Sequence, residues 1–158
     1  MSFRFKSAIA VLILVCGVAL SVAAGPLEDG VHALESGNYA NAMRLLRPLA
    51  AGGDARAQYR IGVMYEKGRG IPVDYSEAVV WFLRAADQGN AETQNHLGFL
   101  YLYGRGVAKD FVAAHMWFDL AATEGDAHAV FSRDLVAAKM TPSQVAEAKK
   151  LARDRKSK

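Results

Sequence analysis

The chain repeats itself with a period of 36 residues, and this repeat constrains the fold more than any other feature of the sequence. When residues 54–89 are aligned with residues 90–125, fourteen positions are identical. Internal repeats of about 20 to 50 residues are typical of solenoids, in which each unit buries its apolar face against the next. The sequence therefore predicts stacked, similar units rather than one globular core.

Polar residues at fixed places in the repeat predict where helices begin. Asp54, Asn90 and Asp126 each precede an alanine-containing run, and such side chains cap helices by accepting hydrogen bonds from free backbone N–H groups. Asp74 and Glu77 have the spacing of a capping box at the start of a second helix. Each repeat is therefore predicted to contain two helices.

A Gly-Arg-Gly sequence, at residues 68–70 and again at 104–106, separates the two predicted helices of each repeat. Glycine readily adopts the positive φ angles that a helix C-cap and a tight loop need. The second helix carries an apolar stripe with helical spacing, made of Ala78, Trp81, Phe82, Ala85 and Ala86. We interpret these aromatic residues, and their equivalents Trp117 and Phe118, as core packing between neighbouring helices.

The flanking segments continue the pattern in altered form. Residues 26–53 predict an N-terminal helix pair, and residues 126–158 predict a degenerate C-terminal pair with a basic tail. Residues 141–144, Thr-Pro-Ser-Gln, are a strong helix start, with a Thr N-cap, Pro at the first position and Gln at the third. Atypical end units suit a solenoid, whose outer faces need polar caps. The predicted fold is an all-α, α/α superhelical solenoid of about eight helices.

Residues 1–25 have the charged, apolar and small-residue order of a secretory signal peptide. Arg4 and Lys6 precede 13 residues whose only polar side chain is the thiol of Cys16. We predict cleavage near Ala24 or Gly25 and a periplasmic or secreted protein; an uncleaved inner-membrane anchor is the alternative. The mature chain would then hold no cysteine and no disulfide, and its net charge would fall from +3 to +1, which gives little support to nucleic-acid binding.

The repeated residues resemble the Sel1-like repeat, a relative of the tetratricopeptide repeat. The shared pattern is Gln-x-x-Ile/Leu-Gly-x-x-Tyr-x-x-Gly-Arg-Gly-Ile/Val-x-x-Asp, followed by Ala-x-x-Trp-Phe and Ala-Ala-x-x-Gly, in residues 54–125. Residues 26–53 are closer to the tetratricopeptide repeat itself. The resemblance implies a superhelix with a concave inner face, and family members mostly act as adaptors that bind other proteins. Many bacterial members are exported.

The sequence offers no catalytic, cofactor-binding or metal-binding set. The four histidines lack the spacing of metal ligands, and we interpret them as solvated or capping residues. No nucleophile elbow is present, and the mature chain has no thiol. A cysteine-rich branch of the resembled family hydrolyses β-lactams, but its cysteines are missing here. We therefore predict no enzyme activity and no cofactor.

If the first helices of the pairs line the concave face, as the resemblance implies, a protein or peptide partner would contact the positions at which the repeats differ. These residues combine aromatic anchors with a polar rim, as binding patches do: Arg56, Tyr59, Val63, Glu66, Glu92, Asn95, Phe99, Leu102, Tyr103, His128 and Phe131. An amphipathic helix or an extended peptide would suit such a groove.

The sequence thus predicts a non-enzymatic, exported adaptor that binds a protein or peptide. Two alternatives remain: an envelope enzyme acting on peptidoglycan or a β-lactam, and a structural accessory domain without a discrete groove. Residues 149–158 carry six cations and one acid. We interpret them as a solvated helix end, with contact to an anionic membrane surface or an acidic partner as the alternative. The identity of the partner and the oligomeric state do not follow from the sequence.

Overall fold

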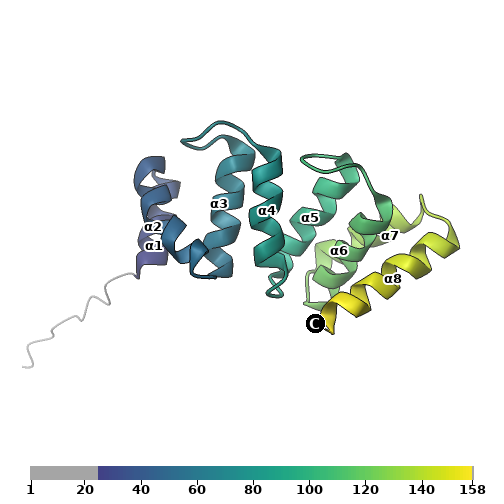
Figure 1. The fold of residues 1–158 in the computed structure, drawn as a ribbon. Coiled ribbons are helices and arrows are strands. Elements are labelled where there is room, and N and C mark those ends of the chain that lie inside the picture. The colour runs from purple at the N-terminus through teal and green to yellow at the C-terminus, as the bar shows by residue number, and fades with distance from the viewer. Residues whose placement is uncertain (1–24, 158) are drawn as a thin grey trace, which may run out of the picture.

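The computed structural model describes residues 25–157, and this part of the chain forms eight α-helices and no strands. The predicted signal peptide lies outside the described residues. The helices follow one another along an elongated molecule from α1 at one end to α7 and α8 at the other (Figure 1). They are α1 (Pro26–Glu35), α2 (Tyr39–Ala51), α3 (Ala55–Lys67), α4 (Tyr75–Ala86), α5 (Ala91–Tyr103), α6 (Phe111–Thr123), α7 (Ala127–Ala137) and α8 (Pro142–Lys156). The predicted all-α solenoid is confirmed.

The helices begin where the capping residues predict. The carboxylates of Asp54 and Asp126 and the side chain of Asn90 each accept a hydrogen bond from the first turn of α3, α7 and α5, respectively. At α8, Thr141 and Gln144 form both halves of a capping box.

Only one of the two hydrogen bonds of the capping box predicted at Asp74 and Glu77 is formed, so the prediction is wrong for the other. The Asp74 carboxylate accepts a hydrogen bond from the Glu77 N–H at 3.0 Å. The Asp74 N–H, however, donates to the carbonyl of Tyr65 at 3.0 Å. Because this donor is already used by the end of α3, it is not available to the Glu77 side chain. The same backbone bond recurs between Asp110 and Tyr101 at 2.9 Å.

A glutamine in each repeat joins one helix pair to the preceding pair. The Gln58 amide donates to the carbonyl of Ala50 at 3.1 Å, and the Gln94 amide donates to that of Ala86 at 3.0 Å. Both carbonyls belong to the last turn of a second helix, and each also accepts a backbone hydrogen bond, from Gly53 and Gly89 respectively. The repeated glutamine therefore adds a hydrogen bond across the boundary between units.

The Gly-Arg-Gly loops also contact the preceding pair. Gly104 ends α5 in the left-handed region with φ 67°, as the sequence predicts. A Cβ atom on Gly106 would collide with the backbone of Tyr75, the first residue of α4. Both long loops lie at the same edge of the molecule (Figure 1), so glycine is required at this edge for close stacking of the units.

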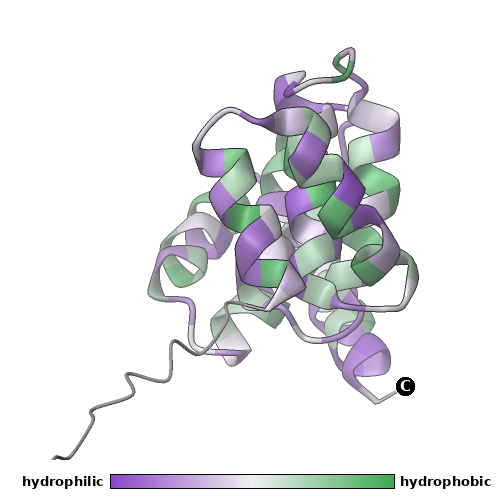
Figure 2. Ribbon diagram, turned by 90° about the vertical axis from the view of Figure 1, so that its left-hand side faces the viewer, coloured by the Kyte–Doolittle hydropathy of each residue, from purple (hydrophilic) through white to green (hydrophobic). Residues whose placement is uncertain are grey.

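The predicted core aromatics are confirmed. Phe82, Phe118 and Trp117 are at most 1% exposed, and Trp81 is 9% exposed. A Cβ atom on Gly98 of α5 would overlap the ring of Phe118 on α6, and a Cβ atom on Gly62 of α3 would overlap the ring of Phe82 on α4. Hydrophobic and hydrophilic residues are interspersed along the helices (Figure 2).

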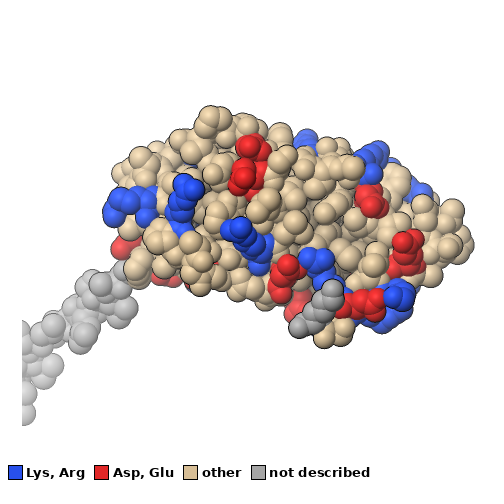
Figure 3. Space-filling view, in the orientation of Figure 1, with Lys and Arg blue, Asp and Glu red and all other residues tan. Residues whose placement is uncertain are grey.

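Helix α8 packs on α6 and closes this end of the core. Its alanines 148 and 152 are buried. The Arg155 guanidinium lies 4.3 Å from the ring centroid of Trp117 and donates from Nε to the Asp87 carboxylate at 3.0 Å. Lys156 pairs with Glu124 at 3.1 Å, and opposite charges lie close together near the end of α8 (Figure 3). At least two cations of the predicted solvated tail therefore form contacts that hold α8 against the rest of the protein.

Candidate functional groove between α5 and α7

An apolar pocket of about 300 Å³ lies between the C-terminal ends of α5 and α7, with the start of α6 beneath it. We call it the α5–α7 groove. Its apolar lining includes three predicted residues, Phe99, Leu102 and Tyr103. The remaining lining residues are Lys109, Phe111, Ser132, Leu135, Val136 and Lys139.

Large apolar side chains remain open to solvent at this groove. Tyr103 is 63% exposed and Leu135 is 53% exposed. Phe131, 68% exposed, lies one turn before Leu135 on the same side of α7, because residues four apart on a helix are neighbours. Exposed apolar groups that gather in one place mark interaction sites more often than isolated ones do.

The repeat explains why this pocket is apolar. Val63 of α3, Phe99 of α5 and Leu135 of α7 occupy equivalent positions when the 36-residue period is continued through α7. The ring of Phe99 stacks on that of Tyr103 at 6.3 Å and meets that of Phe118 edge-on at 5.0 Å between centroids. Phe99 is therefore oriented by the core, while its outer face remains open.

The rim of the groove is basic. Lys109 and Lys139 line it, and Arg105 lies 5.8 Å from the ring centroid of Tyr103. Within residues 25–157, none of these three cations forms an ion pair with a carboxylate. No acidic residue lines the pocket. The groove thus combines an apolar floor with a basic rim that contains no ion pair among the described residues.

The α3 side of the predicted patch is occupied by contacts within the chain. Glu66 is 6% exposed, and its carboxylate lies 3.0 Å from Nε2 of His96 on α5. This hydrogen bond lowers the pKa of Glu66 below its usual value. Tyr59 packs against Phe82 and His96, and burial together with the nearby Glu92 raises its pKa.

The other predicted groove residues lie apart from the pocket. Arg56 is exposed and pairs with Glu28 at 3.3 Å. Glu92 and His128 are also exposed, near the N-terminal ends of α5 and α7, whereas Val63 and Asn95 are half-buried. Of the eleven predicted residues, three line one pocket and a fourth extends it along α7.

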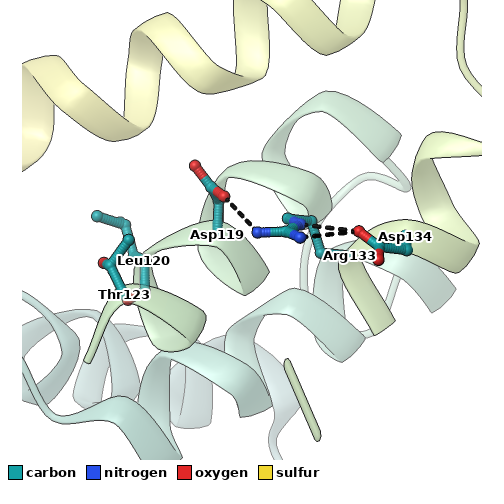
Figure 4. Close-up of polar contacts among 5 residues, drawn as sticks. All are labelled: Asp119, Leu120, Thr123, Arg133 and Asp134. Carbon is teal, nitrogen blue, oxygen red and sulfur yellow. Dashed lines mark hydrogen bonds and ion pairs between the residues drawn. The ribbon is translucent and has the colours of Figure 1, made fainter. Parts of the chain in front are cut away.

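Helix α7 is held in place by an ion-pair bridge. The Arg133 guanidinium lies between Asp119 of α6 and Asp134 of α7, with distances of 3.1 and 2.9 Å (Figure 4). Arg133 is about one-quarter exposed and can hold both carboxylates because its guanidinium presents several donors in a fixed plane. This bridge fixes the wall of the groove that carries Leu135.

The interpretation of the histidines is wrong at two positions. His115 on α6 is 1% exposed, because α5, α7 and α8 all pack on that helix. Burial lowers the pKa of His115 and so favours its neutral form. His96 is partly buried and pairs with Glu66, whereas His32 and His128 are exposed as expected.

Sequence reasoning missed four important groove residues, Lys109, Phe111, Leu135 and Lys139. Continuing the 36-residue alignment into residues 127–139 would have found two of them, because Leu135 aligns with Phe99 and Lys139 with Tyr103. No pattern pointed to Lys109 or Phe111, which reach the pocket through the loop and the start of α6.

Residues 25–157 hold no cluster of His, Cys, Asp and Glu suited to a metal ion. None of the helices described is both long and apolar enough to cross a bilayer. A second cavity of about 630 Å³ lies where α8 meets the ends of α4 and α6, and Gln94, Glu124 and Lys156 are among its lining residues.

Comparison with known proteins identifies the repeat. The Sel1 repeat profile matches residues 55–90 and 91–126. The structure is similar to c5321, described as a protective antigen present in uropathogenic Escherichia coli strains displaying an SLR fold, with a TM-score of 0.76 and 31% sequence identity. This match covers 80% of the present chain and 28% of c5321.

A second solved structure is similar over most of its length. It is a Sel1 repeat protein from Oxalobacter formigenes, with a TM-score of 0.63 and 36% identity. The match covers 69% of the present chain and 85% of that protein. No curated protein sequence matches the chain.

Proposed function

The chain belongs to the Sel1 repeat family, and from this premise we propose that it is a non-enzymatic interaction scaffold that binds a segment of another protein in the α5–α7 groove. Sel1 repeats commonly serve as protein-interaction scaffolds. The observation that carries the assignment to this groove is the group of exposed apolar side chains around one pocket, with Tyr103 63% exposed and Leu135 53% exposed.

Size and composition also support a peptide-binding role. A pocket of about 300 Å³ lies at the small end of the range for small-molecule sites, and such a pocket suits anchoring side chains of a larger partner. The aromatic residues Phe99, Phe111 and Tyr103 are of the kind that carries most of the binding energy at protein interfaces. They stand on helices, which hold them in fixed positions.

Site-specific crosslinking in cells tests this function. A photoreactive amino acid at Tyr103 should give a discrete crosslinked product with another protein. The same group at Val80, an exposed residue of α4, is the matched control and should not give that product. Introducing Leu135→Ser alongside the probe should abolish the product. A product that forms equally from Val80, or that survives Leu135→Ser, would contradict groove binding.

The proposed site of action is outside the cytoplasm, on the strength of the signal-like residues 1–25. Cell fractionation of the full chain, with mass determination of the purified protein, tests this part separately. Export with cleavage should give a periplasmic or secreted protein that begins near Gly25 or Pro26. A protein of full mass in the cytoplasm would refute export and would leave the groove function to be judged on its own test.

A further inference from the structure

The geometry points to a partner segment in which carboxylates flank one or two large apolar side chains. This inference rests on the proposed function, because it specifies the chemistry of the partner that the α5–α7 groove would bind. It depends on the charge of the rim, which is a separate observation from the apolar floor.

None of the rim cations forms an ion pair with a carboxylate in the described part of the chain. Lys109 and Lys139 line the pocket from opposite sides, one before α6 and one after α7. The Lys109 ammonium lies 5.0 Å from the ring centroid of Phe111, and Arg105 lies over Tyr103. Two lysines that line the pocket and an arginine beside it, with no carboxylate lining the pocket, favour a ligand that brings negative charge.

Elsewhere in the structure, three cations of α8 are paired with carboxylates. Arg155 contacts Asp87 and Lys156 contacts Glu124, and Lys150 contacts Asp154. At the groove, by contrast, none of Arg105, Lys109 and Lys139 is paired with a carboxylate of residues 25–157. An acidic segment would be attracted to this groove more than to the end of α8.

The apolar floor determines which partner side chain lies between the partner's carboxylates. Phe99, Leu102 and Tyr103 on one wall face Leu135 and Val136 on the other, so a leucine or aromatic side chain can be buried between α5 and α7. Burying such a side chain removes apolar surface from water and so favours binding. Carboxylates on either side then reach Lys109 and Lys139 at the edge, where they add selectivity and a faster association rate.

A peptide library displayed on phage tests the inference with three forms of the full-length protein. The first is the unchanged protein, the second carries Lys109→Glu and Lys139→Glu, and the third carries Phe99→Ser and Leu135→Ser. Arg47→Glu and Val80→Ser are matched controls, because both residues are exposed on helices outside the groove. Far-ultraviolet circular dichroism and thermal unfolding of each variant establish that it is folded.

The unchanged protein and both controls should select peptides enriched in Asp and Glu around Leu, Phe or Trp. Synthetic copies of these peptides should bind at least tenfold more weakly to the lysine-reversed protein, which should instead select peptides containing Lys or Arg. The Phe99→Ser, Leu135→Ser protein should select no common pattern.

Each contrary outcome refutes a defined part of the reasoning. Neutral or basic peptides that depend on Phe99 and Leu135 would overturn the acidic chemistry while leaving the groove function intact. Peptides unaffected by these two substitutions, or no enrichment by the folded unchanged protein, would overturn the groove function as well. A dimer in light scattering that disappears with Leu135→Ser would identify a second copy as the occupant and overturn the inference.

Discussion

Replacing Glu124 by Gln should stabilise the protein, because it would complete a hydrogen bond that one repeat makes and the next does not. In the first repeat, the Gln58 side chain donates to the preceding helix and its Oε1 accepts from Gln88 at 2.9 Å. Gln94 occupies the equivalent position in the second repeat, but its buried Oε1 has no hydrogen-bond partner. The residue equivalent to Gln88 is Glu124, whose carboxylate has no proton to donate at neutral pH.

The magnitude follows from two opposing terms. Leaving a buried acceptor unsatisfied costs about 1–3 kcal/mol, and an amide at position 124 can remove this cost with the geometry that Gln88 already shows. The substitution also breaks the pair between Glu124 and Lys156, whose side chains are 38% and 55% exposed. Pairs this exposed contribute about 0–1 kcal/mol. We therefore expect Glu124→Gln to raise the free energy of unfolding by about 1 kcal/mol.

Urea unfolding followed by circular dichroism, together with thermal unfolding, measures this change. One kcal/mol corresponds to roughly 4 °C in a domain of this size. Gln88→Glu is the reciprocal control and should destabilise by about 1–3 kcal/mol, because it removes the donor to Gln58. Lys156→Met measures the ion pair alone. If Glu124→Gln is no more stable than Lys156→Met, the amide at position 124 does not reach Gln94 and the reasoning fails.

The other predictions concern the loops, two titrating groups and the terminal helix. Gly106→Val should lower stability by more than about 2 kcal/mol in urea unfolding, because its φ of 72° is strained for valine and its Cβ would collide with Tyr75; a neutral effect would contradict the close approach of the loop. Burial lowers the pKa of His115, so the unfolded chain binds more protons than the folded chain below about pH 6.5. The free energy of unfolding should therefore fall as the pH drops through that value. His115→Leu should flatten this part of the plot of stability against pH, and an unchanged slope of that plot would refute the assignment. The hydrogen bond that lowers the pKa of Glu66 contributes stability above about pH 4.3 that is lost as the pH falls through the lower folded value; Glu66→Gln should remove this loss, and its persistence would locate the titration elsewhere. Arg155→Ala should increase hydrogen exchange in α8 more than in α3, because it removes the contacts with Trp117 and Asp87; equal changes in both helices would contradict a local fastening role.

The scaffold could be predicted from the sequence because its determinants are local and repeated. A cap such as Asp54 acts within one turn of its own helix, and Trp81 and Trp117 show by their identical spacing that they serve the same packing role. Such features depend on helix geometry alone. Because the repeat contains them twice, residues that are identical in both copies can be recognised as structural, and those that differ as variable.

The contacts that escaped prediction join residues at positions that are not equivalent in the repeat. Glu66 and His96 are 30 residues apart, and only the stacking of successive units brings them together. His115 is buried because α8 returns to α6, and the degenerate last pair gave no sign of this packing. Lys109 lies in the loop before α6 and lines the groove. Helical periodicity does not predict which way a side chain in a loop points.

Core and groove are nevertheless connected through one short chain of contacts. Gly98 leaves room for the ring of Phe118, and Phe118 meets Phe99 edge-on at 5.0 Å. A larger residue at position 98 would displace Phe118 and thereby move Phe99, which lines the groove. Under the proposed function, the repeated glycine thus supports binding without touching a partner. Under the proposed function, partner choice depends instead on Phe99 and Leu135, which line the groove from equivalent positions of successive units.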